Sequence, residues 1–173
     1  MLDTDGKRIA AKYYQAKDMA TLPEQLAFEK KLADKTLRTN AKAEAEVLLF
    51  DNCITVCRNC ADVWFYIVGK QTENELILVS VLTTLCDSLN SALRASPDKR
   101  TILDNFETLL LTIDELIDGG MILELDSSAI VNRVGMKGSD AAPIASAETA
   151  FTEQSFNTMF ASAREQIARS LLK

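Results

Sequence analysis

Short apolar runs separated by turn-forming residues dominate the first half of the chain. Residues 8–14 (RIAAKYY) follow the turn-like group Asp3-Thr4-Asp5-Gly6, and their β-branched and aromatic content predicts a strand. Three further apolar runs are separated by turn chemistry at residues 51–52 and 59–62, and these runs are Glu46–Phe50, Ile54–Arg58 and Val63–Gly69. This pattern predicts an antiparallel meander. Because the last run is apolar at every position from 63 to 68, we expect it to be a central strand covered on both faces.

A helix is predicted between the first strand and the meander. Thr21 is a suitable N-cap and Pro23 lies near the first turn, so the helix should begin there and end near Lys35. Leu22, Leu26, Lys30 and Ala33 recur at helical spacing and predict the inward stripe, with Phe28 and Leu32 on its flank.

The second half of the chain has helical periodicity. A first helix from Glu75 carries an apolar stripe of Leu76, Val79, Leu82, Cys86, Leu89 and Leu93, opposite a polar face that includes Ser80, Thr84 and Asp87. A second helix opens at Ser96-Pro97-Asp98 and stops at Gly119-Gly120. A short third helix starts at Asp126-Ser127. Strands followed by helices predict an α+β domain in which helices flank an antiparallel sheet.

The composition changes after residue 136. Gly, Ser, Ala and Pro are frequent from residue 137, and Thr152 then begins an amphipathic pattern. We therefore expect a domain at residues 1–136, a linker at 137–151 and a C-terminal amphipathic helix at 152–173.

Charge and residue usage narrow the possible functions. The net charge is −6 and no basic cluster is dense enough to follow phosphates, so nucleic-acid binding is not expected. The apolar run Leu76–Cys86 is shorter than the roughly 20 residues of a spanning helix, and the first residues do not resemble a signal peptide, which favours a cytosolic protein. The chain contains no histidine, which removes the usual general base and the commonest metal ligand, so we expect no enzyme and no cofactor.

The four cysteines offer the sharpest candidate chemistry. Cys53, Cys57 and Cys60 have the spacing of thiolates that bind an iron–sulfur cluster in radical S-adenosylmethionine enzymes. Such ligands need a loop, whereas Cys53 and Cys57 flank an apparent strand. Zinc bound by these three with Cys86 meets the objection that Cys86 lies on an apolar helical stripe. Small buried residues in a core are therefore the favoured interpretation.

Carboxylates at Asp114, Glu115 and Asp118 are a second candidate, for acid–base chemistry or a hard metal ion. With no other ligand nearby in the sequence, the solvated face of a helix is favoured.

A series of short motifs, in order along nearly the whole chain, resembles coatomer zeta subunits. Each motif is weak alone, but their order and spacing make the joint signal strong. The motifs are residues 5–8 (DGKR), 11–14 (AKYY), 28–30 (FEK), 35–36 (KT), 73–76 (ENEL), 114–115 (DE), 118–124 (DGGMILE), 163–167 (AREQI) and 170–172 (SLL).

This resemblance implies a longin-like fold, in which a five-stranded antiparallel sheet lies between one helix and a pair of helices. It also implies a subunit of the COPI coat that pairs with the coatomer gamma subunit, joins the beta and delta subunits and the outer-coat subunits in the full complex, and reaches the membrane with an Arf-family GTPase. The implied location is the cytoplasm, the cytosolic face of the Golgi membrane and COPI-coated vesicles, in Golgi-to-ER and intra-Golgi transport.

The sigma subunits of clathrin adaptors are the alternative within this class. Sigma subunits that bind dileucine signals have an arginine at the position of Ile9 in this chain. The neighbouring residue here, Arg8, is an arginine. The apolar pocket of these sigma subunits corresponds to Ala61, Val63 and Cys86, so a hydrophobic groove is predicted to persist without its clamp for acidic residues. A longin-type regulatory or SNARE module is the alternative from another class, but it would need a heptad motif and a tail anchor.

The start of the chain differs from the family pattern. Zeta subunits resemble it from the Asp-x-Asp-Gly turn onward and usually have a further segment before that turn, which includes a first strand. Only Met1 and Leu2 precede the turn here. The resemblance therefore predicts a truncated first strand, whose loss would leave neighbouring backbone groups without partners.

Overall fold

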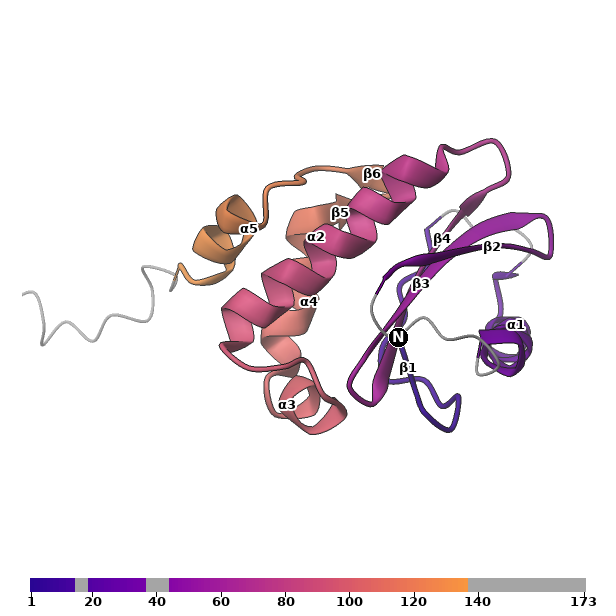
Figure 1. The fold of residues 1–173 in the computed structure, drawn as a ribbon, viewed down its shortest axis with the longest axis horizontal. Coiled ribbons are helices and arrows are strands. Elements are labelled where there is room, and N and C mark those ends of the chain that lie inside the picture. Colours follow the sequence, from indigo (N-terminus) through magenta and orange to yellow (C-terminus); the bar gives the residue numbers. More distant parts are fainter. Residues whose placement is uncertain (15–18, 37–43, 137–173) are drawn as a thin grey trace, which may run out of the picture. The chain divides into compact units, whose positions relative to one another are not determined.

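Three antiparallel strands joined by tight turns form the centre of the fold (Figure 1). The structure is a computed structural model that describes residues 1–14, 19–36 and 44–136. The strands are β2 (Glu46–Phe50), β3 (Cys53–Cys60) and β4 (Val63–Lys70), and with β1 (Leu2–Asp3) they form a sheet of order β1-β4-β3-β2. Asp51 and Asn52 have φ of 46° and 60°, as a two-residue hairpin turn requires. The predicted meander is confirmed.

Helices cover both faces of this sheet (Figure 1). On one face, α1 (Leu22–Thr36) buries Phe28 and Leu32, and the Phe28 ring lies 5.3 Å from that of Phe50 in β2. On the other face, α2 (Glu75–Leu93) packs Leu82 and Leu89 against the inward residues of β3 and β4. This three-layer arrangement confirms the α+β fold class with an antiparallel sheet and flanking helices.

A second layer of short elements packs on α2. These elements are α3 (Lys99–Asp104), α4 (Phe106–Leu116), β5 (Ile117–Asp118), β6 (Met121–Ile122) and α5 (Ser127–Val134). The single helix predicted from Ser96 to Gly119 is wrong in one respect, because the chain breaks at Asn105, where φ is −125°. Both pieces still bury their apolar side, since Ile102, Leu109 and Leu116 are fully buried.

The segment predicted as the first strand, residues 8–14, does not form one. Arg8 makes an isolated bridge with Leu2, and residues 11–14 have no ladder partner among the described residues. Strand β1 contains two residues and pairs with Val63 and Trp64 of β4. A strand is defined by its neighbour, so β-propensity alone could not produce a ladder here.

The same short β1 limits how much of β4 is central. Val63 and Phe65 are fully buried and Trp64 is nearly so, but Val68 is 41% exposed. The predicted coverage of this strand on both faces therefore holds at its start and fails at its end.

The buried faces of α1 and α2 differ from the predicted stripes. In α1 the core positions are Phe28, Leu32 and Ala33, while Leu22 and Leu26 are largely exposed. In α2, Leu76 is 74% exposed, whereas the predicted polar position Thr84 is buried. The predictions for Ala33, Leu82, Cys86 and Leu89 are confirmed, since all four are buried. The other differences arise because apolar residues are frequent on both sides of these helices.

Among the described residues, α2 is the one helix that is long and apolar enough to cross a membrane by length and composition. Helix α2 contains 19 residues and is longer than the apolar run Leu76–Cys86. In this fold it lies as the core helix on the sheet, with Leu82, Cys86 and Leu89 fully buried. The described residues belong to one unit, Met1–Met136. The predicted linker at 137–151 and helix at 152–173 lie outside the described residues, and that division of the chain stays a prediction.

Candidate functional site

The three residues predicted to line a peptide groove lie around the start of β4. Val63 and Cys86 are fully buried in the main core cluster. Ala61 is exposed in the β3–β4 turn and has a φ of 55°. In this conformation Val63 and Cys86 offer no surface to a peptide, so binding there would require α2 to move from the sheet. The groove stays a prediction.

Arg8 lies in a buried ion pair instead of facing solvent. Its guanidinium donates from Nε to both Glu29 carboxylate oxygens at 2.9 and 3.0 Å, and its Nη2 lies 2.7 Å from Glu29 Oε1. Tyr13 donates its hydroxyl to the same oxygen at 2.9 Å, and Gln25 accepts a further bond from Arg8 at 3.3 Å. The carboxylate is thus held by α1 and addressed by two side chains of the N-terminal segment.

In the cluster of Arg8, Tyr13, Gln25 and Glu29, the carboxylate is buried more deeply than the guanidinium. The Glu29 side chain is 7% exposed and that of Arg8 is 22% exposed. The hydrogen bond that Arg8 donates to Glu29 raises the pKa of Arg8, and burial together with Glu29 raises the pKa of Tyr13 well above its usual range. The Arg8 guanidinium is already engaged by Glu29 and Gln25. The arrangement therefore fastens the N-terminal segment to α1 and does not present a free cation.

The cysteines of the sequence motif do not converge. Because β3 is unbroken, Cys53 and Cys57 share one sheet face about 13 Å apart, at roughly 3.3 Å per residue. Cys57 packs with Trp64 on the α1 side, whereas Cys60 packs against the α2 side. Three thiolates on one cluster would need to approach one another closely, so the strand geometry separates them. Cys60 packs against the core cluster that contains Cys86, and the interaction with the Cys86 thiol lowers the pKa of Cys60 to about 7.

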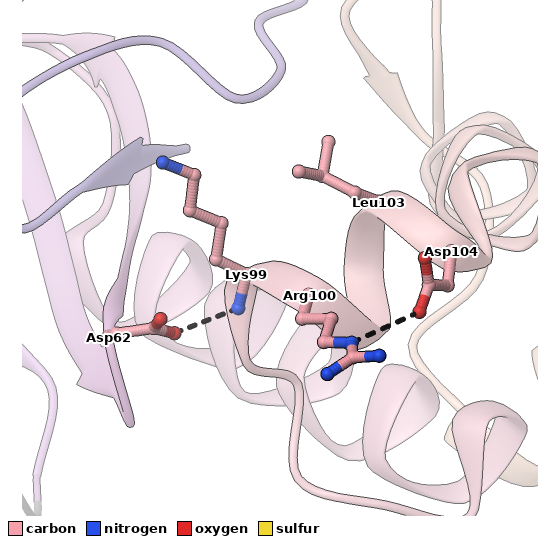
Figure 2. Close-up of a pocket in the computed structure, with 5 residues that line it drawn as sticks. All are labelled: Asp62, Lys99, Arg100, Leu103 and Asp104. Atoms are coloured by element: carbon pink, nitrogen blue, oxygen red, sulfur yellow. Dashed lines mark hydrogen bonds and ion pairs between the residues drawn. The ribbon is translucent and has the colours of Figure 1, made fainter.

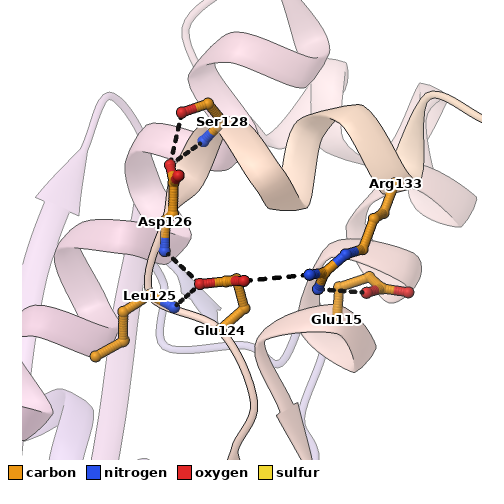
Figure 3. Close-up of polar contacts among 6 residues, drawn as sticks. All are labelled: Glu115, Glu124, Leu125, Asp126, Ser128 and Arg133. Carbon is orange, nitrogen blue, oxygen red and sulfur yellow. Dashed lines mark hydrogen bonds and ion pairs between the residues drawn. The ribbon is translucent and has the colours of Figure 1, made fainter.

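The carboxylates of α4 are likewise distributed among different cations. Asp114 pairs with Lys12, and Glu115 pairs with Arg133 of α5 at 3.4 Å. Arg133 also lies 3.2 Å from Glu124, as Figure 3 shows. The two exposed pairs of Arg133 connect α4, α5 and the segment between them, and the Lys12 pair connects α4 to the N-terminal segment. At roughly 0–1 kcal/mol each, they brace this layer modestly and do not assemble an acid–base pair.

A pocket of about 330 Å³ lies beside α3, lined by Asp62, Lys99, Arg100, Leu103 and Asp104. Figure 2 shows that its polar groups already contact one another: the Lys99 amide donates to Asp62 at 2.8 Å, and Arg100 lies 3.8 Å from Asp104. The Lys99 ammonium points to Asp3, 2.9 Å away. No uncompensated charge at this pocket would select a ligand.

Exposed apolar side chains offer a larger candidate for contact with another protein. On α4, Phe106, Leu110 and Leu111 are 37–44% exposed. The following segment exposes Met121, Ile122, Leu123 and Leu125. Several large apolar side chains exposed on consecutive elements are typical of a surface that contacts another protein.

Comparison with known proteins places this fold in a family. Residues 1–141 match the clathrin adaptor complex small chain family. The whole chain is 42% identical to coatomer subunit zeta-1 of Arabidopsis thaliana, of which it covers 94%. It is 41% identical to coatomer subunit zeta-1 of Homo sapiens, of which it covers 90%.

One comparison of structures concerns the fold alone. A chain in a homology model of the full-length AP-3 complex, in a stretched open conformation, is similar with a TM-score of 0.52 and 17% identity. The similarity covers 77% of this chain and 87% of that one. It supports the longin-like arrangement of a sheet between one helix and a group of helices.

The chain belongs to the small chains of adaptor complexes, because residues 1–141 match that family. The sheet and its flanking helices agree with this fold. Within that class the chain belongs to the coatomer zeta subunits, because its similarity to them extends over its full length. This confirms the resemblance that the ordered sequence motifs indicated.

The Arg8–Glu29 ion pair is a contact that sequence reasoning missed. Glu29 follows Phe28 and recurs with Gln25, Leu32 and Thr36 at helical spacing, so a correctly phased α1 face would have included it. Cys60 and Cys86 were considered together only as half of a four-cysteine zinc site, whereas the packing of α2 on β3 places both in one core cluster.

Proposed function

We propose that this chain is a non-catalytic subunit of the COPI (coatomer) vesicle coat. The observation that carries the proposal is 41–42% identity over the whole chain to coatomer subunit zeta-1 of both plants and mammals. The longin-like fold suits a subunit that assembles with others, since its exposed apolar side chains on α4 would be covered in a complex.

The non-catalytic part of the proposal is supported by residue chemistry. The chain has no histidine. The buried carboxylate Glu29 is engaged by Arg8 and Tyr13, and the α4 carboxylates Asp114 and Glu115 are each paired with a cation. These groups perform structural tasks in the described part of the chain.

The finer assignment follows the family resemblance. The coatomer gamma subunit is the proposed direct partner, with the beta and delta subunits and the outer-coat subunits in the full complex. Membrane association is peripheral, through the complex and an Arf-family GTPase at the cytosolic face of the Golgi. The proposed task is Golgi-to-ER and intra-Golgi vesicle transport.

A pull-down from cytosol tests the proposal directly. The tagged full chain is expected to recover coatomer subunits, with gamma retained after a high-salt wash, while the tag alone recovers none. Recovery of clathrin-adaptor large chains in place of coatomer would overturn the proposal and favour the sigma-type alternative. The match of residues 1–141 to the clathrin adaptor small chains is compatible with that alternative. Co-expression of the chain with gamma alone then tests whether the contact is direct.

A second expectation concerns sorting signals. We propose that the chain does not bind acidic dileucine peptides, because Ile9 replaces the arginine of the binding sigma subunits and the adjacent Arg8 is held by Glu29. The purified pair with gamma should bind such a peptide no better than a control peptide whose two leucines are replaced by alanine. Micromolar, leucine-dependent binding would contradict this.

A further inference from the structure

Strand β2 is an edge of the four-stranded sheet. The strand order β1-β4-β3-β2 leaves one side of β2 without a strand neighbour in the described part of the chain. Phe50 and Cys53 are cross-strand partners on either side of a two-residue turn, and such residues bond each other across the hairpin. Because this bonding alternates along an antiparallel ladder, the backbone groups of Val47 and Leu49 face the open side. The Leu49 carbonyl accepts from the Lys35 ammonium there, at 2.8 Å.

Apolar side chains line this edge on the face of the sheet that α2 covers. Val47 and Leu49 are 44% and 58% exposed. Their cross-strand partners, Val56 and Ile54, are buried in the core cluster that includes α2. Helix α2 therefore covers the middle of the apolar sheet surface and leaves its margin at β2 open to solvent. An edge strand with exposed apolar side chains and open backbone groups is a template for pairing with a further strand.

The opposite face of β2 carries charges of both signs. Glu46 begins the strand, and because side chains alternate it projects from the same face as Phe50, whose ring packs on α1. The Lys35 ammonium of α1 lies 5.2 Å from the centre of the Phe50 ring, at the other end of the strand. The two charges are about 13 Å apart along the strand, at roughly 3.3 Å per residue. They are too distant to form an ion pair with each other.

A two-fold pairing of two β2 strands satisfies the backbone and apolar groups together. Antiparallel pairing centred on Leu48 places Val47 of each copy opposite Leu49 of the other. The outward N–H and C=O groups of these two residues then bond each other across the contact. Their exposed side chains cover one another on the α2 face, which removes apolar surface from water.

The same pairing also joins the opposite charges. It places Glu46 of each copy opposite Phe50 of the other, and Lys35 stands over that ring. The Lys35 ammonium then exchanges its bond to a neutral carbonyl for an ion pair with a carboxylate. Both the apolar and the charged groups of β2 are therefore self-complementary in one register.

We propose that β2 is a homodimer contact, at which two copies of this chain pair their β2 strands antiparallel about Leu48 and join two sheets into one. A lysine at an edge strand discourages pairing with arbitrary strands, and a second copy brings a carboxylate to the matching position. Since the contact is confined to one short strand, its area is small and the dimer should be weak and reversible. This inference does not depend on the partners proposed above.

Analytical ultracentrifugation of the full chain in reducing buffer tests the contact. The sedimentation coefficient should rise with protein concentration. Leu49→Lys should abolish the rise, because it places a charge at the apolar contact. Leu103→Lys is the matched control, since Leu103 is 51% exposed on α3 and lies outside the contact. Val47→Pro should also abolish the rise, because it removes an N–H that points away from β3 and leaves the β2–β3 ladder intact.

A charge exchange tests the register. Glu46→Lys and Lys35→Glu should each weaken dimerisation about tenfold, because two symmetry-related ion pairs are lost. The double variant should return to the wild-type dissociation constant, since the pairs form again with reversed signs. A double variant that dimerises no better than the single variants would overturn this register.

Amide hydrogen exchange identifies the edge itself. The Val47 and Leu49 amides should exchange more slowly as concentration rises, whereas the Leu48 amide, which bonds within the hairpin, should not change. Trp64 fluorescence checks that each variant is folded. A chain that stays monomeric at its highest soluble concentration, or a dimer that Leu49→Lys leaves intact, would overturn the proposal. Protection of these amides only after the gamma subunit is added would also overturn it and assign the edge to that subunit.

Discussion

Replacing Glu29 with glutamine would leave the shape of α1 nearly unchanged and remove the charge that holds Arg8. In the native domain, the Glu29 carboxylate accepts two bonds from Arg8 Nε and one from the Tyr13 hydroxyl. A glutamine side chain would keep one acceptor oxygen and turn an NH2 donor toward the guanidinium. Arg8 would then be a largely buried cation without its partner.

The size of the effect follows from burial. Breaking a fully buried ion pair by removing one partner costs about 3–5 kcal/mol. Because the Arg8 side chain keeps 22% of its exposure, water offsets part of that loss, and we expect Glu29→Gln to reduce the free energy of unfolding by about 2–3 kcal/mol. Tyr13→Phe removes one bond to a charged acceptor and should cost about 1–2 kcal/mol.

Urea unfolding followed by tryptophan fluorescence measures these changes. Trp64 is the single tryptophan of the chain and is 6% exposed in the fold, so its emission reports unfolding of the domain. Asp34→Asn is the matched control, since Asp34 is an exposed acidic residue of the same helix and should change stability by less than about 0.5 kcal/mol.

A double-mutant cycle decides whether the cluster acts as a unit. Glu29→Gln and Tyr13→Phe share one acceptor oxygen, so the double variant should lose at least about 0.5 kcal/mol less than the sum of the two single losses. The reasoning would be refuted if Glu29→Gln were as harmless as Asp34→Asn, or if the two losses were simply additive.

Three further outcomes are expected. Leu82→Ala should cost about 3 kcal/mol of unfolding free energy, because Leu82 is fully buried. Leu76 is 74% exposed on the same helix, so Leu76→Ala should cost less than about 0.5 kcal/mol. Equal losses in urea titrations would contradict the observed buried face of α2. Burial alone would raise the pKa of Asp3, but the Lys99 ammonium and the backbone amides that Asp3 accepts outweigh it and hold this pKa below 3.8. The stabilisation by Asp3 is therefore present above pH 3.8 and lost as pH falls through the lowered pKa, so Asp3→Asn should lower the urea midpoint at pH 7 and flatten its decline in acid; an unchanged decline would count against this. Deletion of residues 148–173 should leave the urea transition of the domain intact and weaken coat assembly, and undiminished co-purification of gamma would contradict that expectation.

Signals that act within a few residues of the chain could be interpreted from the sequence. Asp51 and Asn52 tolerate positive φ and predicted the β2–β3 turn, which the structure places there. Asp98 has a short side chain that caps α3 by accepting from the Thr101 amide at 2.7 Å. Thr21 immediately precedes α1. These interactions are local, so the strands of the meander and the helix starts followed from residue types and spacing.

Only the tertiary structure decided which side of each element is buried and which distant groups meet. Residues 8–14 have the composition of a strand, but beyond the isolated Arg8–Leu2 bridge they form no ladder with the described part of the chain. Helices α1 and α2 have apolar residues around much of their circumference, so their buried faces depend on how they pack on the sheet, and Glu29 turns inward for that reason. The Arg8–Glu29 ion pair joins residues more than twenty positions apart, and no periodicity along the chain records such a contact.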